Sequence, residues 1–395
     1  MQITFYILLA IIAYTYIGYG LVLILLNSFK KNKSPKPENN PLEVTLLIAA
    51  YNESRILTQK IKNSLSLDYP KSKLKIAIVT DGSTDSSRKI IEQYPYIIHY
   101  HKDERRGKIN AINRIMPKIK SQITVFSDAN VMLNKNAIFE LIKHFSNENT
   151  AVVSGEKVIL KDKNATASSS GEGFYWKYES FLKKMDAKLN TLVGSAGELF
   201  AIRTQLYSEV KEDTIIEDFF MTMSLASRGF KVEYEPKAIA TETGSLNMKE
   251  EEKRKVRISA GGIQAITRLI SLLKFWKHPL LTFQYLSHRV FRWTLTPLAL
   301  FLIVPINALL LSQGLIFILV FTAQILFYLL AFFGYLLRNK SIKYKVIHIP
   351  YYFLFMNTCV IKGWIRFFKN SQNVTWEKSE RIMTSKFVFA TESNN

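Results

Sequence analysis

The chain carries long apolar segments at both ends and a charged, mixed segment between them. The first, Thr4 to Leu26, is close to the roughly 20 apolar residues with which a helix crosses a bilayer. No basic segment precedes it and no small-x-small cleavage site follows, so residues 1–28 are predicted as a membrane helix rather than a cleaved signal peptide. By the positive-inside rule, the basic residues that come next place the main part of the chain in the cytosol: Lys30, Lys31, Lys33 and Lys36.

The C-terminal part of the chain predicts further membrane segments. Residues 263–293 mix apolar residues with Lys274, Trp276 and Lys277, which is typical of helices that lie on a membrane surface. Residues 294–338 contain two apolar runs, predicted as two transmembrane helices. The last apolar segment, from about residue 346 to residue 368, contains several polar residues and either crosses the bilayer or lies at its interface. The interfacial alternative is favoured, with residues 339–395 ending in a cytosolic tail.

Between the membrane segments, residues 29–42 form a basic linker and residues 43–262 form the predicted soluble domain. Short β-rich runs alternate there with helical segments, at 44–49, 74–80, 123–127 and 151–153 for the strands and 54–66, 86–94 and 108–119 for the helices. The strands are apolar throughout rather than alternating, which predicts an α/β fold with a mostly parallel sheet covered on both faces. Nucleotides bind such sheets beyond the carboxyl ends of the strands.

The net charge of +21 limits the classes of partner that this chain is expected to bind. There is no recognisable nucleic-acid fold or Arg-rich strip, so no nucleic-acid partner is expected. A basic face against anionic lipid accounts for the charge, and attraction of an anionic nucleotide into a basic cleft is compatible with it. The single cysteine, Cys359, excludes an internal disulfide and any zinc site built from cysteines.

Two predicted strands end in residues that suit a nucleotide pocket. The first ends in Ala49-Ala50-Tyr51-Asn52-Glu53, where small residues let a nucleotide approach and a carboxylate can receive hydrogen bonds. The second ends in Asp81-Gly82-Ser83-Thr84-Asp85. Each motif also has a purely structural explanation, as the start of a helix with an N-terminal cap.

Three further motifs carry charge. Lys108 follows Gly107 at a predicted helix start and can reach a diphosphate, although a solvated charge run explains it equally well. Asp128-Ala129-Asn130 ends a strand with two oxygen ligands of the kind that Mg²⁺ or Mn²⁺ prefers, unless the motif is only a turn. Glu217-Asp218 sits among apolar residues, where a partly desolvated carboxylate can act as a general base or can simply stabilise a helix N-terminus.

In their order and spacing these motifs resemble glycosyltransferase family 2, in particular its membrane branch of hyaluronan, cellulose and poly-N-acetylglucosamine synthases. The resemblance extends well over about residues 44–262. It implies a GT-A fold, an inverting mechanism, a nucleotide-sugar donor and a divalent metal, Mg²⁺ or Mn²⁺.

Carried over residue by residue, the resemblance implies the following roles. Asp218 would be the catalytic base. The donor would contact Ala50, Tyr51, Glu53, Asp81, Lys108, Asp128 and Arg257. The metal would be held by Asp128 and Asn130, with Asn in place of the family's last Asp. The acceptor side of the site would be bordered by Gly197, Glu198, Glu217, Trp376 and Arg381, and only a cytosolic tail could bring the last two there.

The family's Gln-x-x-Arg-Trp element is incomplete in this chain. Arg257 can stand for its Arg, but Arg254 replaces the Gln and Ile258 replaces the acceptor-stacking Trp. This departure puts sustained chain elongation in doubt. His99 and His101, which could chelate a metal weakly, are more simply alternate residues of a strand.

The function predicted from the sequence is an inverting glycosyltransferase in cell-surface polysaccharide synthesis. It would be a multi-pass plasma-membrane protein with its catalytic domain in the cytosol, using a donor such as a UDP-sugar. One alternative is a single addition to a polyprenyl phosphate or another lipid-linked acceptor. The other is a non-catalytic nucleotide-sugar-binding protein. Three spans are few for an enclosed polymer channel, so an export or assembly partner is also expected.

Overall fold

The computed structural model describes residues 1–30, 41–160, 167–338 and 345–369. Most of the predicted linker 29–42 lies outside the described residues, as do Trp376 and Arg381.

The centre of the molecule is one eight-stranded sheet with the strand order β3-β2-β1-β4-β7-β6-β8-β5. Strands β3, β2, β1 and β4 are mutually parallel, and β6 is parallel to β8. The pairings β4–β7, β6–β7 and β5–β8 are antiparallel, so the sheet is more mixed than the sequence suggested. The strands are β1 Val44–Ala50, β2 Leu74–Asp81, β3 Ile97–Lys102, β4 Ile123–Asp128, β5 Met132–Leu133, β6 Thr150–Ile159, β7 Leu199–Arg203 and β8 Lys231–Glu242.

Helices cover both faces of this sheet, which explains the unalternating apolar strands. Leu47 and Val79 point to a core shared with α5 and α8, whereas Ile48 and Ile78 point to a core shared with α3 and α6. These helices confirm the predicted α/β fold. The helices of the soluble domain are α3 Ser54–Leu65, α4 Ser87–Glu92, α5 Lys108–Ile115, α6 Ala137–Ile142, α7 Ala167–Leu189, α8 Glu217–Ser227 and α9 Met248–Arg268.

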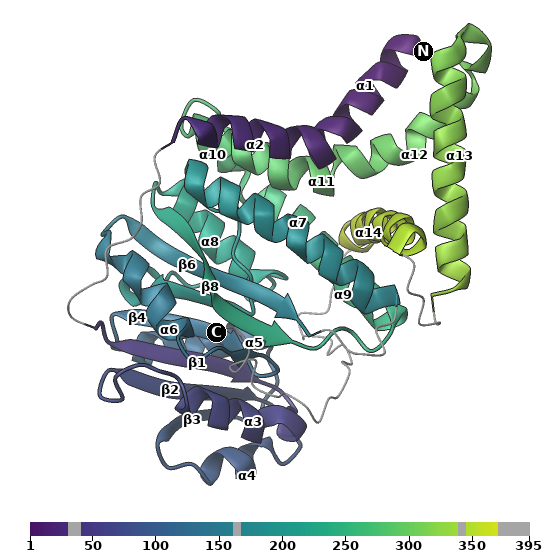
Figure 1. Ribbon diagram of the computed structural model, residues 1–395. Helices are drawn as coiled ribbons and strands as arrows, with labels where there is room; N and C mark the ends of the chain where they lie inside the picture. The colour runs from purple at the N-terminus through teal and green to yellow at the C-terminus, as the bar shows by residue number, and fades with distance from the viewer. Residues whose placement is uncertain (31–40, 161–166, 339–344, 370–395) are drawn as a thin grey trace, which may run out of the picture.

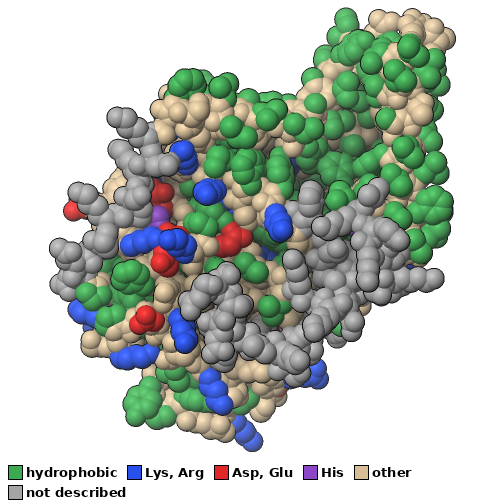
Figure 2. Space-filling model, viewed as in Figure 1, with side chains coloured by type: hydrophobic (Ala, Val, Ile, Leu, Met, Phe, Trp, Pro, Cys, Tyr) green, Lys and Arg blue, Asp and Glu red, His purple; other side chains and the backbone are tan. Residues whose placement is uncertain are grey.

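The remaining helices stand to one side of the sheet, with α7 lying between them and the sheet (Figure 1). Their side chains are mostly hydrophobic on the face shown in Figure 2, whereas charged side chains gather over the sheet domain. They are α1 Gln2–Ala13, which continues through a π-helical turn into α2 Tyr19–Ser28, then α10 Pro279–Tyr285, α11 Phe291–Trp293, α12 Leu295–Ala308, α13 Leu315–Leu336 and α14 Lys345–Phe368.

Two of the described helices are long and apolar enough to cross a membrane, namely Gln2–Ser28 and Leu315–Leu336. Helix α12 has 14 residues, short of the roughly 20 that a span needs. It reaches that length only together with Pro279–Trp293, from which it is bent by 51°. A third span therefore depends on this broken pair.

Helix α9 connects the sheet domain to the apolar helices. Asn247 caps its start by accepting hydrogen bonds from the backbone N–H groups of Lys249 and Glu250. The helix runs past the predicted domain boundary at residue 262 and ends at Arg268. Helix α14 packs against α9 and is tied to it by the ion pair of Lys362 with Glu252 and the hydrogen bond from Tyr352 to Glu251.

Candidate active site

The carboxyl ends of three parallel strands bring three of the predicted residues to one edge of the sheet. Ala50 ends β1, Asp81 ends β2 and Asp128 ends β4. In the strand register Ala49 lies opposite Asp128, and Ala50 lies opposite Thr80, the residue before Asp81. Residues from separate sequence motifs are therefore neighbours in space.

Asp81 lines a pocket at this edge of the sheet, and one of its two carboxylate oxygens has no hydrogen-bond partner among the described residues. Oδ2 accepts hydrogen bonds from the backbone N–H groups of Arg106 (3.0 Å) and Gly107 (2.6 Å). Oδ1 is buried and has no hydrogen-bond partner among the described residues. Burial raises the pKa of Asp81, although both N–H groups act to lower it. A buried acceptor of this kind is costly unless a ligand satisfies it. The pocket is lined by Ala49, Ala50, Tyr51, Val79, Asp81, Arg105, Gly107, Lys108 and Ala111.

Tyr51 lines the same pocket with one face of its ring covered by a cation. The Arg105 guanidinium lies 3.9 Å from the centroid of the Tyr51 ring. Gly82, with φ of 65°, allows this approach, because a Cβ there would lie 2.6 Å from the Cβ of Arg105. The pocket thus combines an aromatic ring, a cation and a carboxylate, a set that suits a nucleotide.

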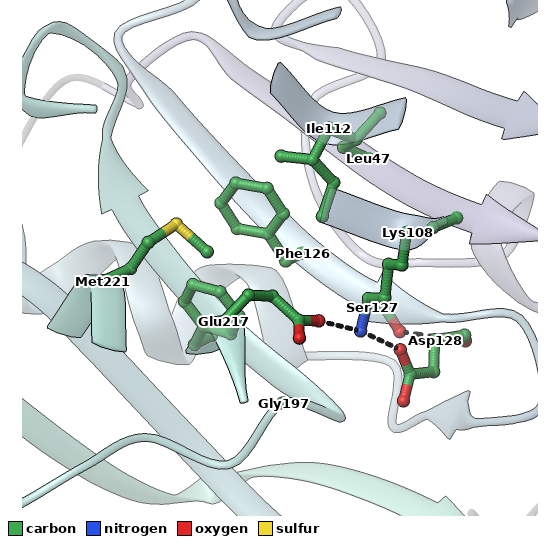
Figure 3. Close-up of a pocket in the computed structure, with 11 residues that line it drawn as sticks. Leu47, Lys108, Ile112, Phe126, Ser127, Asp128, Gly197, Glu217 and Met221 are labelled. Atoms are coloured by element: carbon green, nitrogen blue, oxygen red, sulfur yellow. Dashed lines mark hydrogen bonds and ion pairs between the residues drawn. The ribbon is translucent and has the colours of Figure 1, made fainter. Parts of the chain in front are cut away.

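Lys108 begins α5 and places its ammonium between two carboxylates from other elements (Figure 3). Its Nζ lies 2.8 Å from Asp128 Oδ1 and 2.9 Å from Glu217 Oε1. The three side chains, each less than a fifth exposed, line a second pocket together with Gly197, Phe126 and Met221. Lys108 therefore ties the end of β4 to the start of α8.

The opposite charges of this bridge stabilise one another. Burial by itself would lower the pKa of Lys108, but Asp128 and Glu217 together outweigh it and raise that pKa well above its usual value. Burial would likewise raise the pKa of Glu217, but Lys108 outweighs it and lowers that pKa. Lys108 and Glu217 are therefore both charged at neutral pH.

Asp218 lies beside this bridge in the first turn of α8. Burial, and next the charge of Glu217, raise its pKa to about 7. Gly197 lies directly against it, since a Cβ at position 197 would be 2.8 Å from Asp218 Oδ2. The backbone carbonyl of Asp218 accepts hydrogen bonds from the hydroxyls of Ser195 (3.3 Å) and Thr222 (2.9 Å). A carboxylate with a pKa near neutrality, held in this way, has the properties of a general base.

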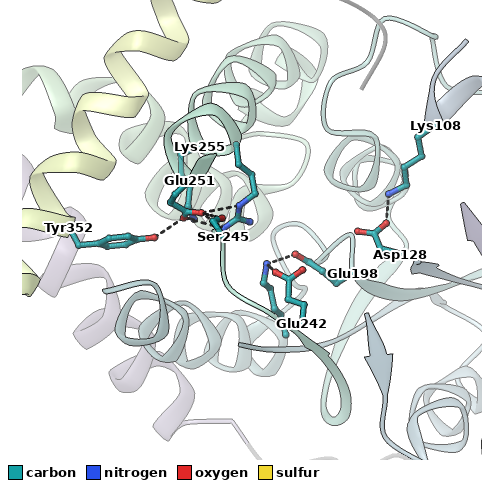
Figure 4. A network of polar contacts seen from close by, with 10 residues as sticks. Lys108, Asp128, Glu198, Glu242, Ser245, Glu251, Lys255 and Tyr352 are labelled. Carbon is teal, nitrogen blue, oxygen red and sulfur yellow. Dashed lines mark hydrogen bonds and ion pairs between the residues drawn. The ribbon is translucent and has the colours of Figure 1, made fainter. Parts of the chain in front are cut away.

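Glu198 follows Gly197 and lies close to Glu242 (Figure 4), with a buried lysine as the counter-ion of both. Lys157 in β6 lies 2.5 Å from Glu198 Oε1 and also pairs with Glu242 in β8. Burial would raise the pKa of Glu198, but Lys157 outweighs it and lowers that pKa. Glu198 is therefore a fixed anion that positions the loop next to Asp218.

Arg257 approaches the same carboxylates from α9. Burial lowers its pKa, and the nearby charges of Glu217, Asp218 and Asp128 act in the opposite direction. The helix thus brings a guanidinium to the site from the side of the apolar helices. Ile258, one residue further, packs its partly buried side chain against the core.

Five of the predicted residues that the structure describes do not line the two pockets: Asp218, Glu198 and Arg257, which lie beside them, and also Glu53 and Asn130. The backbone N–H of Glu53 donates to Ser87 Oγ (3.0 Å), and Glu53 is the residue immediately before α3. Asn130 lies in the turn after β4 and is half-buried. Neither residue is among those that line the pockets.

The match to a known family agrees with this geometry. Residues 41–261 match the family described as "Glycosyltransferase like family 2", which is more than half of the chain. The chain belongs to this family. It is a glycosyltransferase with a GT-A-like fold.

Curated relatives of this glycosyltransferase include poly-beta-1,6-N-acetyl-D-glucosamine synthases. The synthase of Staphylococcus aureus (strain COL) is 26% identical over 265 residues, which cover 64% of this chain and 63% of the relative. The synthase of Staphylococcus epidermidis is 25% identical over 249 residues, covering 61% of this chain and 60% of the relative. The match thus spans less than two thirds of these relatives' own length.

Among solved structures, the mannosyltransferase PcManGT from Pyrobaculum calidifontis, in complex with GDP-Man and Mn²⁺, has the same fold. The TM-score is 0.72 at 18% identity, and the match covers 94% of this chain and 99% of that one. The likeness therefore includes the apolar helices as well as the sheet domain.

The site fits a divalent metal only if a ligand supplies further oxygens. Among the described residues no group of three or more His, Cys, Asp or Glu side chains could hold a metal. Asp128, followed two residues later by Asn130, offers one carboxylate and one amide oxygen. Mg²⁺ and Mn²⁺ in phosphate sites are commonly bound by one or two protein oxygens plus the phosphates. This donor set fits such a metal.

Sequence reasoning missed two residues of the site, Arg105 and Lys157. Arg105 belongs to a run of charged residues that has no helical or strand periodicity. Lys157 lies 41 residues before Glu198, in a strand read only as far as Val153. A lysine near the end of a largely apolar strand was the available signal, because it needs a partner when buried.

Proposed function

We propose that this glycosyltransferase moves a sugar from a nucleotide-diphosphate donor to a hydroxyl group of a glycan, with inversion at the anomeric carbon. The observation that carries the proposal is the Lys108 bridge between Asp128 and Glu217, with Asp218 beside it. The bridge lies next to the pocket that contains the unpartnered oxygen of Asp81. A diphosphate can reach Lys108 while its nucleoside occupies that pocket.

Different residues of the site would contact different parts of the donor. Asp81 would accept a hydrogen bond from the base or ribose, with Ala50 and Tyr51 forming the wall and Glu53 nearby. Lys108 and Arg257 would neutralise charge that develops on the leaving diphosphate, which is usually the largest contribution to such a reaction. Mg²⁺ or Mn²⁺, held by Asp128 and Asn130, would add charge neutralisation when bound, and Mn²⁺ accompanies GDP-Man in PcManGT.

Asp218 would act as the base. It would take the proton of an acceptor hydroxyl that attacks the anomeric carbon from the side opposite the diphosphate. A single displacement of this kind inverts the configuration, and it requires one base rather than a nucleophile. Gly197 would leave room for the acceptor directly against this carboxylate, with Glu198 holding the loop.

The acceptor proposal rests on the relatives. The similarity to poly-N-acetylglucosamine synthases supports a growing glycan as the acceptor and a role in cell-surface polysaccharide synthesis. The apolar helices would anchor the enzyme in the plasma membrane with the sheet domain in the cytosol. Helix α14 packs on α9 of the sheet domain, which supports an interfacial position for it. Export of a long product would need oligomers or a second protein.

One observation favours a second candidate, the single addition of a sugar to a lipid-linked acceptor such as a polyprenyl phosphate. Ile258 occupies the place of the family's acceptor-stacking Trp and packs into the core. An enzyme without that aromatic platform has less to hold a long glycan in register. The length of the product separates the two candidates.

The decisive experiment is release of nucleoside diphosphate by detergent-purified enzyme. A panel of UDP- and GDP-sugars is supplied with Mg²⁺ or Mn²⁺, and any product is sized by electrophoresis. Metal-dependent release from one donor supports the transferase, and product size then distinguishes polymer from single addition. Nucleotide binding with no release from any donor, even with membrane extracts as acceptor source, would favour a non-catalytic nucleotide-sugar-binding protein.

Asp81→Asn is expected to weaken donor binding about tenfold with little change in kcat. The Asn carbonyl can keep the hydrogen bonds from Arg106 and Gly107, but its NH₂ group then faces the pocket in place of an acceptor oxygen. One lost hydrogen bond to a charged group is worth about 1.5 kcal/mol. Steady-state kinetics of the active donor measures the effect, with the exposed Asp68→Asn as control. An unchanged KM would remove Asp81 from the donor site.

A further inference from the structure

Lys60, in α3, is a fully buried lysine that the mechanism above does not use. Its side chain is 0% exposed. The ammonium donates hydrogen bonds to Ser127 Oγ and to the backbone carbonyl of Val131, both at 2.7 Å. Burial lowers its pKa to about 7, with the charge of Asp128 acting in the opposite direction. The ammonium therefore lies near Asp128, on the far side from solvent.

The two acceptors of Lys60 stand immediately before and after the segment that contains Asp128 and Asn130. One turn further along α3, Asn63 holds the next part of the chain. Its Nδ2 donates to the Leu133 carbonyl, and its Oδ1 accepts from the Leu133 N–H, both at 2.8 Å. One face of α3 therefore fixes the whole connection from β4 to β5.

Burying an ammonium at this position is energetically unfavourable. Transfer of a charged amine out of water costs several kcal/mol, and an apolar side chain of similar volume could pack there without that cost. Lys60 does, however, what no apolar side chain can do. It holds both ends of a turn whose own backbone contributes one long hydrogen bond, from Val131 N–H to the Asp128 carbonyl at 3.4 Å.

We propose that Lys60 is a positioning residue that sets the geometry of Asp128 and Asn130 for the divalent cation of the donor diphosphate. This inference rests on the proposed function, because it assigns the two oxygens to a metal–diphosphate complex. Lys60 does not touch the substrate. It fixes the turn from behind, whereas Lys108 contacts Asp128 from the side of the pocket.

Two variants separate positioning from a plain effect of charge. Lys60→Met removes the clamp together with a positive charge that would repel a metal. Ser127→Ala removes one anchor of the clamp and leaves the ammonium in place. Weaker metal binding in both variants follows from positioning. A charge effect alone would instead strengthen metal binding in Lys60→Met and leave Ser127→Ala unchanged. Lys62→Met, an exposed lysine of the same helix, is the matched control.

The measurement is calorimetric binding of UDP and GDP to the full-length protein over a series of Mn²⁺ concentrations, together with amide hydrogen exchange. At limiting Mn²⁺ we expect both variants to bind the preferred nucleotide at least about fivefold more weakly, a loss near 1 kcal/mol. Saturating Mn²⁺ should restore the affinity to within about twofold of the unmodified protein. Amide hydrogen exchange should be faster in residues 128–133 of both variants than in the unmodified protein, and it should stay unchanged in the other strands.

The outcomes are distinct. Unchanged nucleotide binding and exchange in both variants, with normal binding by the unmodified protein, would overturn the role of Lys60 alone. Tighter binding in Lys60→Met alone would also overturn it, in favour of electrostatics. Absence of Mn²⁺-dependent nucleotide binding by the unmodified protein would overturn the proposed function, and this inference with it. If Lys60→Met does not fold, Ser127→Ala carries the test.

Discussion

Asp218→Asn is expected to abolish sugar transfer and to make the folded protein more stable above pH 7. The expected loss of turnover is at least about 100-fold, because an amide cannot take the proton of the acceptor hydroxyl. Burial and the adjacent Glu217 raise the pKa of Asp218 to about 7, so its charged form is held in an unfavourable environment. The variant removes that charge and nearly preserves the shape of the side chain.

The sign of the stability change follows from proton linkage. A carboxyl group whose pKa is raised by folding binds its proton more tightly in the folded protein than in the unfolded chain. The contribution of Asp218 to stability therefore falls as the pH rises from about 4 to about 7. Asp218→Asn does not share this loss. Its free energy of unfolding should exceed that of the unmodified protein by on the order of 1–3 kcal/mol above pH 7, and the difference should vanish below pH 4.

Thermal unfolding in detergent at pH 5, 7 and 8.5, beside nucleoside-diphosphate release, measures both effects. The exposed Asp68→Asn is the control and should change neither. In the unmodified enzyme, kcat/KM should fall about tenfold per pH unit below pH 7, as the base takes up its proton. Near-normal turnover by Asp218→Asn would assign the base to another residue. Reduced stability at every pH would mean that Asp218 is a structural carboxylate.

The parts of the fold that the sequence predicted correctly are those marked by a pattern in neighbouring residues. β1 and β2 were expected as apolar runs, and their ends, Ala50 and Asp81, were recognised because a small and an acidic residue stand there at the end of an apolar strand. The direction of β7 and of β5 carries no such signal. An apolar run looks the same whether its neighbour is parallel or antiparallel, which is why the sheet is more mixed than predicted.

In the site, the sequence identified charged groups but not their partners. Lys108 was expected to reach a diphosphate, and nothing in its motif pointed to Glu217, more than one hundred residues later, as one of its two counter-ions. Glu198 was expected to border the acceptor, whereas its ion pair with Lys157 depends on β6 and β7 lying side by side. Lys60 was passed over because a lysine in an amphipathic helix normally faces solvent.

Boundaries in the apolar half were harder to place, because hydropathy does not report bends. The first of the two predicted C-terminal spans was expected from about residue 295 to residue 311, but the structure ends α12 at Ala308 and bends it by 51° from the preceding helix. Thr294, with φ of −130° and ψ of −91°, is the residue at that break. The π-helical turn Leu286–Val290 and Pro297, in the first turn of α12, lie on either side of this break, and sharp bends in helices occur mostly at such features.

Lys108→Met is the second variant with a large expected effect, and it should damage both stability and catalysis. Without its ammonium, the buried carboxylates of Asp128 and Glu217 face one another across the pocket with no cation between them. Breaking a buried ion pair by removing one partner costs about 3–5 kcal/mol. Turnover should fall by about 10²- to 10³-fold, the usual consequence of losing one group that stabilises the charge of a leaving group.

A second substitution separates these two losses. Lys108→Met combined with Glu217→Gln removes one of the unpaired charges, so thermal unfolding should show that most of the lost stability returns. Activity should not return, because the leaving diphosphate still lacks its lysine. If the double variant regained turnover as well as stability, Lys108 would be a structural counter-ion for Glu217 and Asp128. Charge neutralisation at the diphosphate would then fall to Arg257, the guanidinium that α9 brings to the same carboxylates.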